Sequence, residues 1–149
     1  MNKQHYRQLI SSAFISEPIA KYNMLRASTE LAEEFFELLA EEQRELQLKE
    51  LGDIYFWLTW LSIELDFDLC PEYISPNTIV CVKNVIGSIK RIYRDNNNAK
   101  LIELPALINQ LLASLLAKYN VAETDIMKAN YAKINRRLNN GTIQGEGTR

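Results

Sequence analysis

The chain has 149 residues, of which 47% are apolar, enough for one domain with a substantial hydrophobic core. Its first residues contain no apolar segment typical of an export signal, and its most apolar run, residues 54–61, is too short to span a bilayer. We therefore expect a single cytoplasmic domain over residues 1–149 that makes no contact with a membrane.

The net charge of −2 conceals two oppositely charged halves. Residues 1–78 hold 6 Lys/Arg against 14 Asp/Glu, whereas residues 79–149 hold 11 Lys/Arg against 5 Asp/Glu. One interpretation is that the halves simply pack on each other; another is that the acidic half binds metal and the basic half binds phosphate. A nucleic-acid polymer is not expected as a partner, because the acidic half would repel its backbone.

Helical periodicity extends through almost the whole chain, and no alternating strand pattern is present. Ser16-Glu17-Pro18 is typical of a helix start, with serine as N-cap and proline in the first turn. Pro71 and Pro76 mark a loop over residues 67–77, and residues 141–149 form a glycine-rich tail. The expected helices cover residues 3–15, 18–45, 47–66, 78–94, 105–119 and 123–138.

These helices predict an all-α fold with a four-helix-bundle-like core. A weak internal repeat is visible, because Glu50-Leu51-Gly52-Asp53-Ile54 parallels Glu103-Leu104-Pro105-Ala106-Leu107. Either the core is a degenerate tandem repeat of helical hairpins, or the two segments are alike only because both belong to ordinary helical hairpins.

Two carboxylates interrupt the most apolar helix of the chain. Glu50 and Asp53 are three residues apart, so they share a helical face, and the same face continues into Trp57 and Trp60. Carboxylates on an interior face need a counter-charge. A bound divalent cation would supply it; the alternative is a buried salt bridge to lysine or arginine.

A second acidic set lies about twenty residues upstream, on the helix that begins at Pro18. Its apolar residues gather on one side of the helix and its glutamates on the other. The glutamates either form a solvated face or join Glu50 and Asp53 around a hard cation. The apolar side holds Leu31, Phe35, Leu38 and Leu39, and the acidic side holds Glu30, Glu33, Glu34, Glu37 and Glu41.

These acidic motifs resemble those of the MazG-like all-α nucleoside triphosphate pyrophosphohydrolases. That family has an E-E-x-x-E helix followed by E-x-x-D, which Glu50-Leu51-Gly52-Asp53 matches. Two registers fit the first element, Thr29-Glu30-Leu31-Ala32-Glu33 and Glu33-Glu34-Phe35-Phe36-Glu37. The first is preferred, because Ala32 is a small residue that would let the helices approach.

Two further segments of the chain resemble the same family. Residues 129–137, Ala-Asn-Tyr-Ala-Lys-Ile-Asn-Arg-Arg, are similar to its N-x-x-K-hydrophobic-x-x-R helix. The glycine-rich tail ending in Arg149 is similar to that of phage-type members, although Gly147-Thr148 stands where Asp-Asn is commoner. The likeness extends from about residue 24 to the end of the chain.

The resemblance implies Mg²⁺-dependent hydrolysis of a (deoxy)nucleoside triphosphate to monophosphate and pyrophosphate, with Mn²⁺ as a substitute metal and a homodimeric assembly. It implies metal ligands at Glu30, Glu33, Glu50 and Asp53, and a proton acceptor at Glu33 or Glu34. Substrate would be bound by Asn130, Lys133, Arg137 and Arg149. The alternative is a non-catalytic helical binding or regulatory module with a degenerate nucleotide site.

Overall fold

The computed structural model describes residues 1–13, 20–71 and 77–141, and every regular element in these ranges is an α-helix. This confirms the all-α prediction. The helices in chain order are α1 (Lys3–Ala13), α2 (Ala20–Ala40), α3 (Arg44–Glu64), α4 (Thr78–Asp95), α5 (Ala99–Tyr119) and α6 (Glu123–Asn139).

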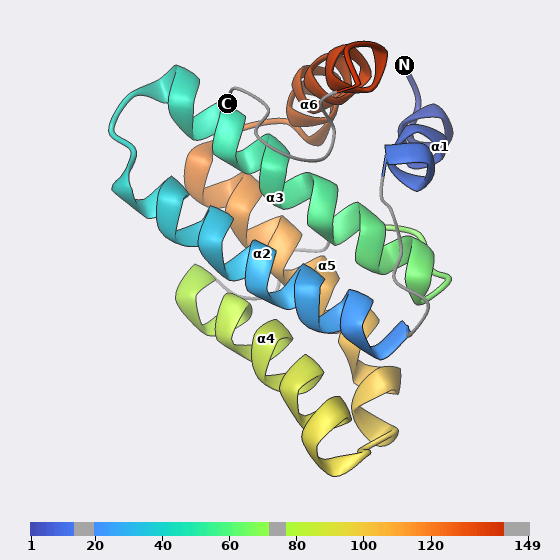
Figure 1. Ribbon diagram of the computed structural model, residues 1–149. Helices are drawn as coiled ribbons and strands as arrows, with labels where there is room; N and C mark the ends of the chain where they lie inside the picture. The colour runs from blue at the N-terminus through green and yellow to red at the C-terminus, as the bar shows by residue number, and fades with distance from the viewer. Residues whose placement is uncertain (14–19, 72–76, 142–149) are drawn as a thin grey trace.

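Four of the helices enclose the core (Figure 1). α2 packs against α3 and α4, while α5 packs against the same two helices from the other side, so the contacts form a closed ring. α1 and α6 pack on each other and on α3, outside this ring. The central helix α3 is therefore surrounded, and it carries buried residues on nearly all sides.

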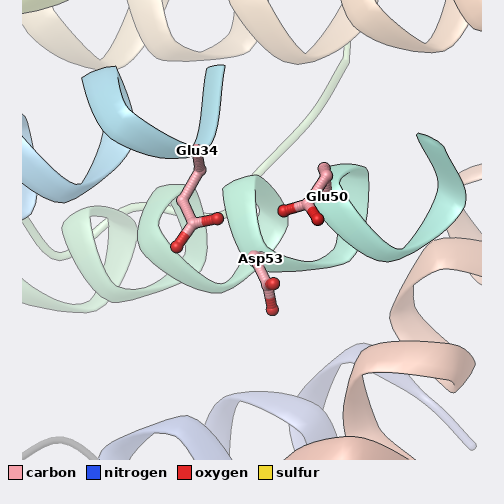
Figure 2. Close-up of side chains that lie close together, drawn as sticks. All are labelled: Glu34, Glu50 and Asp53. Carbon is pink, nitrogen blue, oxygen red and sulfur yellow. The ribbon is translucent and has the colours of Figure 1, made fainter. Parts of the chain in front are cut away.

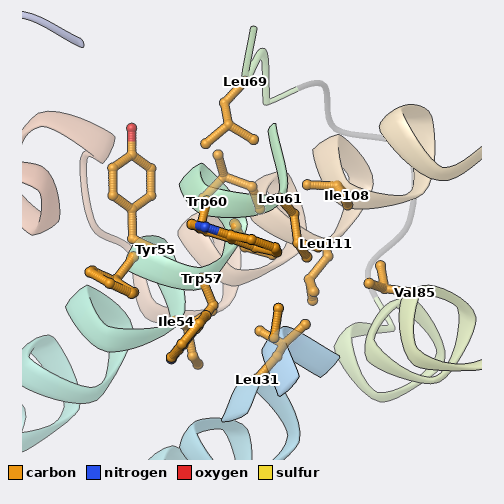
Figure 3. Packing of buried hydrophobic residues seen from close by; sticks show 14 of the residues in the cluster. Leu31, Ile54, Tyr55, Trp57, Trp60, Leu61, Leu69, Val85, Ile108 and Leu111 are labelled. Atoms are coloured by element: carbon orange, nitrogen blue, oxygen red, sulfur yellow. The ribbon is translucent and has the colours of Figure 1, made fainter. Parts of the chain in front are cut away.

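The core is built mainly of aliphatic side chains around the two tryptophans of α3 (Figure 3). Trp57 and Trp60 are both buried, as their place on an interior face predicts, and Leu31 of α2 and Leu111 of α5 belong to the same cluster. Leu39, which the periodicity assigned to the buried side of α2, is exposed instead. It lies at the edge of the predicted apolar side, about 100° from Leu38, and that edge faces solvent.

Three predicted helix boundaries were wrong. α2 ends at Ala40, and α3 already begins at Arg44 with Gln43 in an extended backbone conformation. α5 begins at Ala99 and contains Pro105, which the sequence had suggested as its start. Pro105 is the seventh residue of α5, beyond the four N–H groups that have no acceptor within the helix, so it removes one backbone hydrogen bond but does not end the helix.

α5 is long and apolar enough to cross a membrane when judged by length and composition alone. Core helices of globular proteins satisfy the same criterion. Its residues Leu104, Ile108, Leu111, Leu112 and Leu115 are buried against the other helices.

Candidate metal centre and anion cleft

Three carboxylates converge at the interface between α2 and α3 (Figure 2). Glu34 extends from α2 toward Glu50 and Asp53 of α3, and one oxygen of each lies within 4.8 Å of the others. Glu34 and Glu50 are only 7% and 3% exposed. Acidic side chains at such depth are rare without a compensating cation, so the cluster is a candidate site for a hard metal ion.

The preferred motif register on α2 predicts that Glu30 and Glu33 meet α3, but the structure places Glu34 there instead. Glu30 is half-exposed and lies 4.0 Å from Arg26 on its own helix, and Glu33 is exposed. Glu34, which the sequence suggested as a proton acceptor, takes the place expected for a ligand. Ala32, the small residue that favoured the first register, lies near the outer face of the helix, away from Glu34.

A glycine on α3 provides the close approach that was expected from Ala32. A Cβ atom at Gly52 would lie 3.2 Å from the Cβ and 3.3 Å from the Nδ2 of Asn130 on α6. Glycine therefore lets α6 pack tightly against α3 at the position next to Asp53. The amide of Asn130 uses this space to donate from Nδ2 to the Oδ1 atom of Asp53, at 3.2 Å.

Two lysines supply positive charge to the carboxylates of α3. Lys133 of α6 donates to both oxygens of Asp53, at 2.5 and 2.6 Å, and both side chains are mostly buried. Lys49 donates to Oε1 of Glu50 at 3.0 Å. The salt-bridge alternative is thus present in the structure, and any cation bound here competes with Lys133 for Asp53.

Glu50 nevertheless keeps one carboxylate oxygen without a partner. Its Oε2 atom is buried and accepts no hydrogen bond from the described residues. A buried carboxylate oxygen left unsatisfied costs free energy. The donor set around it, all carboxylate oxygens, is the one that Mg²⁺ and Mn²⁺ prefer, so the residues present fit a divalent ion.

The electrostatics of Lys49 indicate a fourth carboxylate near this cluster. Burial alone would lower the pKa of Lys49, but its hydrogen bond and ion pair with Glu50 outweigh that effect. The charges of Asp53 and Glu37 raise the pKa further. Glu37 lies one turn beyond Glu34 on α2, on the acidic face. It was part of the second register in the sequence, and it was not chosen as a ligand.

A tyrosine from the first helix supports the Asp53 side of the cluster. Tyr6 of α1 is buried, and its hydroxyl donates to the Oδ1 atom of Asn130 at 2.7 Å. This bond fixes the amide so that Nδ2 faces Asp53. Sequence reasoning missed Tyr6, because nothing in the spacing of the chain relates it to a residue 124 positions away.

A cleft with a volume of about 480 Å³ opens beside the carboxylates, between the first half of α3 and α6. Its charged lining is mainly basic and includes Lys49, Lys133, Arg136 and Arg137, with Asn130 and Gly52 at its inner wall. The predicted substrate residues Asn130, Lys133 and Arg137 thus lie together, and Arg136 is an addition. Arg149 lies outside the described residues.

The chain matches no family model, no curated protein and no solved structure. The resemblance to the MazG-like enzymes therefore rests on the sequence motifs alone.

Proposed function

We propose that the protein hydrolyses nucleoside triphosphates to monophosphate and pyrophosphate in a Mg²⁺-dependent reaction. One observation carries this proposal: a buried carboxylate cluster lies next to a basic cleft, and the two share Lys133. A carboxylate site suits a divalent ion, and a basic cleft suits a polyphosphate. A complex of a divalent cation with a polyphosphate offers a positive charge to the carboxylates and negative charges to the basic cleft.

Within this proposal Glu34, Glu50 and Asp53 would hold the ion, and Glu37 would stay outside the metal shell. A bound divalent ion would supply positive charge to the polyphosphate and would lower the pKa of a water. Asn130, held by Tyr6, keeps Asp53 oriented toward the cluster.

The basic residues of α6 would hold the phosphates. Lys133 lines the cleft and also contacts Asp53, so its ammonium group can turn from the carboxylate to an anion in the cleft. Arg136 and Arg137 add guanidinium groups with bidentate geometry for phosphate. Hydrolysis breaks the bond between the α-phosphorus and the bridging oxygen, water adds to that phosphorus, and pyrophosphate leaves. Glu37, the carboxylate of α2 outside the metal shell, would accept the proton of the water.

The test is to incubate the protein with each of the eight common NTPs and dNTPs, with Mg²⁺ and with EDTA, and to separate the products. We expect monophosphate and pyrophosphate in equal amounts, only with metal. Glu50→Gln should abolish turnover. Glu103→Gln is the matched control, because Glu103 occupies the parallel position of the possible repeat and is exposed on α5, paired with Lys100.

The competing function is a regulatory module that binds a ligand without turnover. The ion pairs of Lys49 and Lys133 favour it, since they give the carboxylates counter-charges from the chain itself. Ligand-dependent thermal stabilisation without product for any of the eight nucleotides would establish the module and refute the hydrolase.

A further inference from the structure

The outer face of α2 carries an apolar stripe where a surface helix normally carries polar residues. Four of its side chains are among the large apolar residues most exposed in the structure: Tyr22 (56%), Leu25 (37%), Phe36 (68%) and Leu39 (43%). Figure 1 shows α2 on the near side of the bundle, between α3 and α4. The stripe is exposed along the length of the helix.

The spacing of this stripe is that of a helix–helix seam. With Thr29 and Ala32 included, its members are Tyr22, Leu25, Thr29, Ala32, Phe36 and Leu39, which alternate steps of three and four residues. At 100° per residue they cover an arc of about 100°, centred about 140° from the middle of the buried face. The stripe is therefore a second apolar face and not the margin of the core.

The hydroxyl group near the centre of the stripe does not oppose burial. The hydroxyl of Thr29 donates to the carbonyl oxygen of Leu25 at 3.0 Å, so it needs no further partner. Ala32 is small enough to let another helix come close. A facing helix would therefore bury mainly apolar surface, which is the favourable term in association.

We propose that this stripe is the interface between two copies of the chain, with α2 of one antiparallel to α2 of its partner. An antiparallel pairing about an axis between residues 30 and 31 fits the side chains. It places Tyr22 opposite the partner's Leu39, Leu25 opposite the partner's Phe36, and Thr29 opposite the partner's Ala32. Large residues thus meet at both ends and small residues meet at the centre, where the helices must approach most closely.

Charge along one edge of the stripe supports the same arrangement. Arg26 and Glu33 lie on the same flank of α2 and on opposite sides of the proposed axis, about 4.5 and 2.5 residues from it, so the two would be offset by about 3 Å along the helices, within reach of their long side chains. An antiparallel two-fold pairing brings like flanks together, so Arg26 of one chain would meet Glu33 of the other, twice in each dimer. Both residues are exposed, and a self-complementary surface of this kind fits a second copy better than an unrelated partner.

Oligomeric state and its response to charge test the proposal. Sedimentation equilibrium of the wild-type protein should give twice the 17.2 kDa chain mass at micromolar concentration. Phe36→Glu should give the monomer mass. The matched control is Ile102→Glu, which places the same charge on an isoleucine that is 83% exposed on α5, outside the stripe, and should leave the dimer intact.

The charge pair tests the orientation of the helices. Arg26→Glu and Glu33→Arg should each raise the dissociation constant of the dimer about tenfold, because each substitution turns the two attractive charge pairs of the dimer into repulsive ones. The double variant Arg26→Glu/Glu33→Arg should restore the wild-type dissociation constant. Circular dichroism checks that every variant keeps its helices.

Three results would overturn the proposal. A monomeric wild-type protein would remove the interface, and equal weakening by Phe36→Glu and Ile102→Glu would remove its assignment to α2. Failure of the double variant to recover would refute the antiparallel pairing. None of these measurements uses nucleotide or metal, so the outcome is independent of the proposed hydrolase activity.

Discussion

The two carboxylates of α3 should respond oppositely to substitution when no metal is present. Asp53 forms a mostly buried ion pair with Lys133, whose side chain is 16% exposed. Asp53→Ala leaves that ammonium group without its partner. Glu50 has an unsatisfied oxygen, and its partner Lys49 is 31% exposed and can turn to water. Glu50→Gln removes a buried charge at little cost.

The magnitudes follow from this difference in burial. Breaking a buried ion pair costs about 3–5 kcal/mol. Because Lys133 keeps some exposure, we expect Asp53→Ala to lower the free energy of unfolding by about 3 kcal/mol, which corresponds to about 6–12 °C in Tm for a chain of this size. Glu50→Gln loses an ion pair whose lysine is partly exposed, worth up to about 1 kcal/mol, and relieves repulsion from Glu34 and Asp53. Its Tm should stay unchanged or rise.

Thermal unfolding in EDTA and then in a Mg²⁺ series measures both effects. Mg²⁺ should stabilise the wild-type protein by RT ln(1 + [Mg²⁺]/Kd), about 1.4 kcal/mol at ten times Kd, and should stabilise neither variant. Lys133→Met should bind Mg²⁺ more tightly than wild type, because the competing ammonium group is gone. If Asp53→Ala and Glu50→Gln have the same Tm in EDTA, the ion pair does not contribute as argued. If Glu50→Gln retains the full Mg²⁺ shift, the metal does not bind at this cluster.

Further predictions concern the residues around the site. Gly52→Ala should lower the free energy of unfolding by about 1 kcal/mol. Overpacking against Asn130 costs about 2 kcal/mol, and the higher helix propensity of alanine returns about 1 kcal/mol. The same variant should weaken Mg²⁺ binding in a thermal-shift titration. Tyr6→Phe loses a buried hydrogen bond and Tyr55→Phe a partly buried one, each worth about 1–2 kcal/mol in urea unfolding, but only Tyr6→Phe should weaken Mg²⁺ binding. Burial raises the pKa of both tyrosines, so stability is full below the unfolded value of 10.0 and should fall as pH rises above it, less steeply in the two phenylalanine variants. Arg137→Ala should lower kcat/KM roughly ten- to a hundredfold and leave Mg²⁺ binding unchanged in the same titration.

Local spacing was enough to place Glu50 and Asp53 together, and both belong to the carboxylate cluster. Glu50 and Asp53 share a helical face because they are three residues apart, and no tertiary information is needed to see it. The likeness of residues 129–137 to a family helix likewise brought Asn130 and Lys133 into the site, and both contact Asp53. Their side chains meet α3 through the packing of α6, which the sequence alone does not specify.

The α2 half could not be predicted in this way. Glu30, Glu33, Glu34 and Glu37 lie within an arc of about 100°, so periodicity places all of them on one acidic face. The rotation of α2 against α3 decides which of them reaches Asp53, and that rotation depends on how the buried side chains of both helices interlock. A rotation that buries Leu31 and Leu38 turns Glu34 inward and leaves Glu33 outside.

The same rotation explains why α2 carries two apolar faces and a narrow acidic flank between them. Its buried face packs on α3 and α4, with Glu34 at the margin that meets α3. On the proposed assembly its outer face meets the partner's α2, with Glu33 at the opposite margin. Neighbouring glutamates would thus have separate roles, one in the metal site and one in dimer pairing. The sequence motif E-E does not separate these roles, whereas the orientation of the helix does.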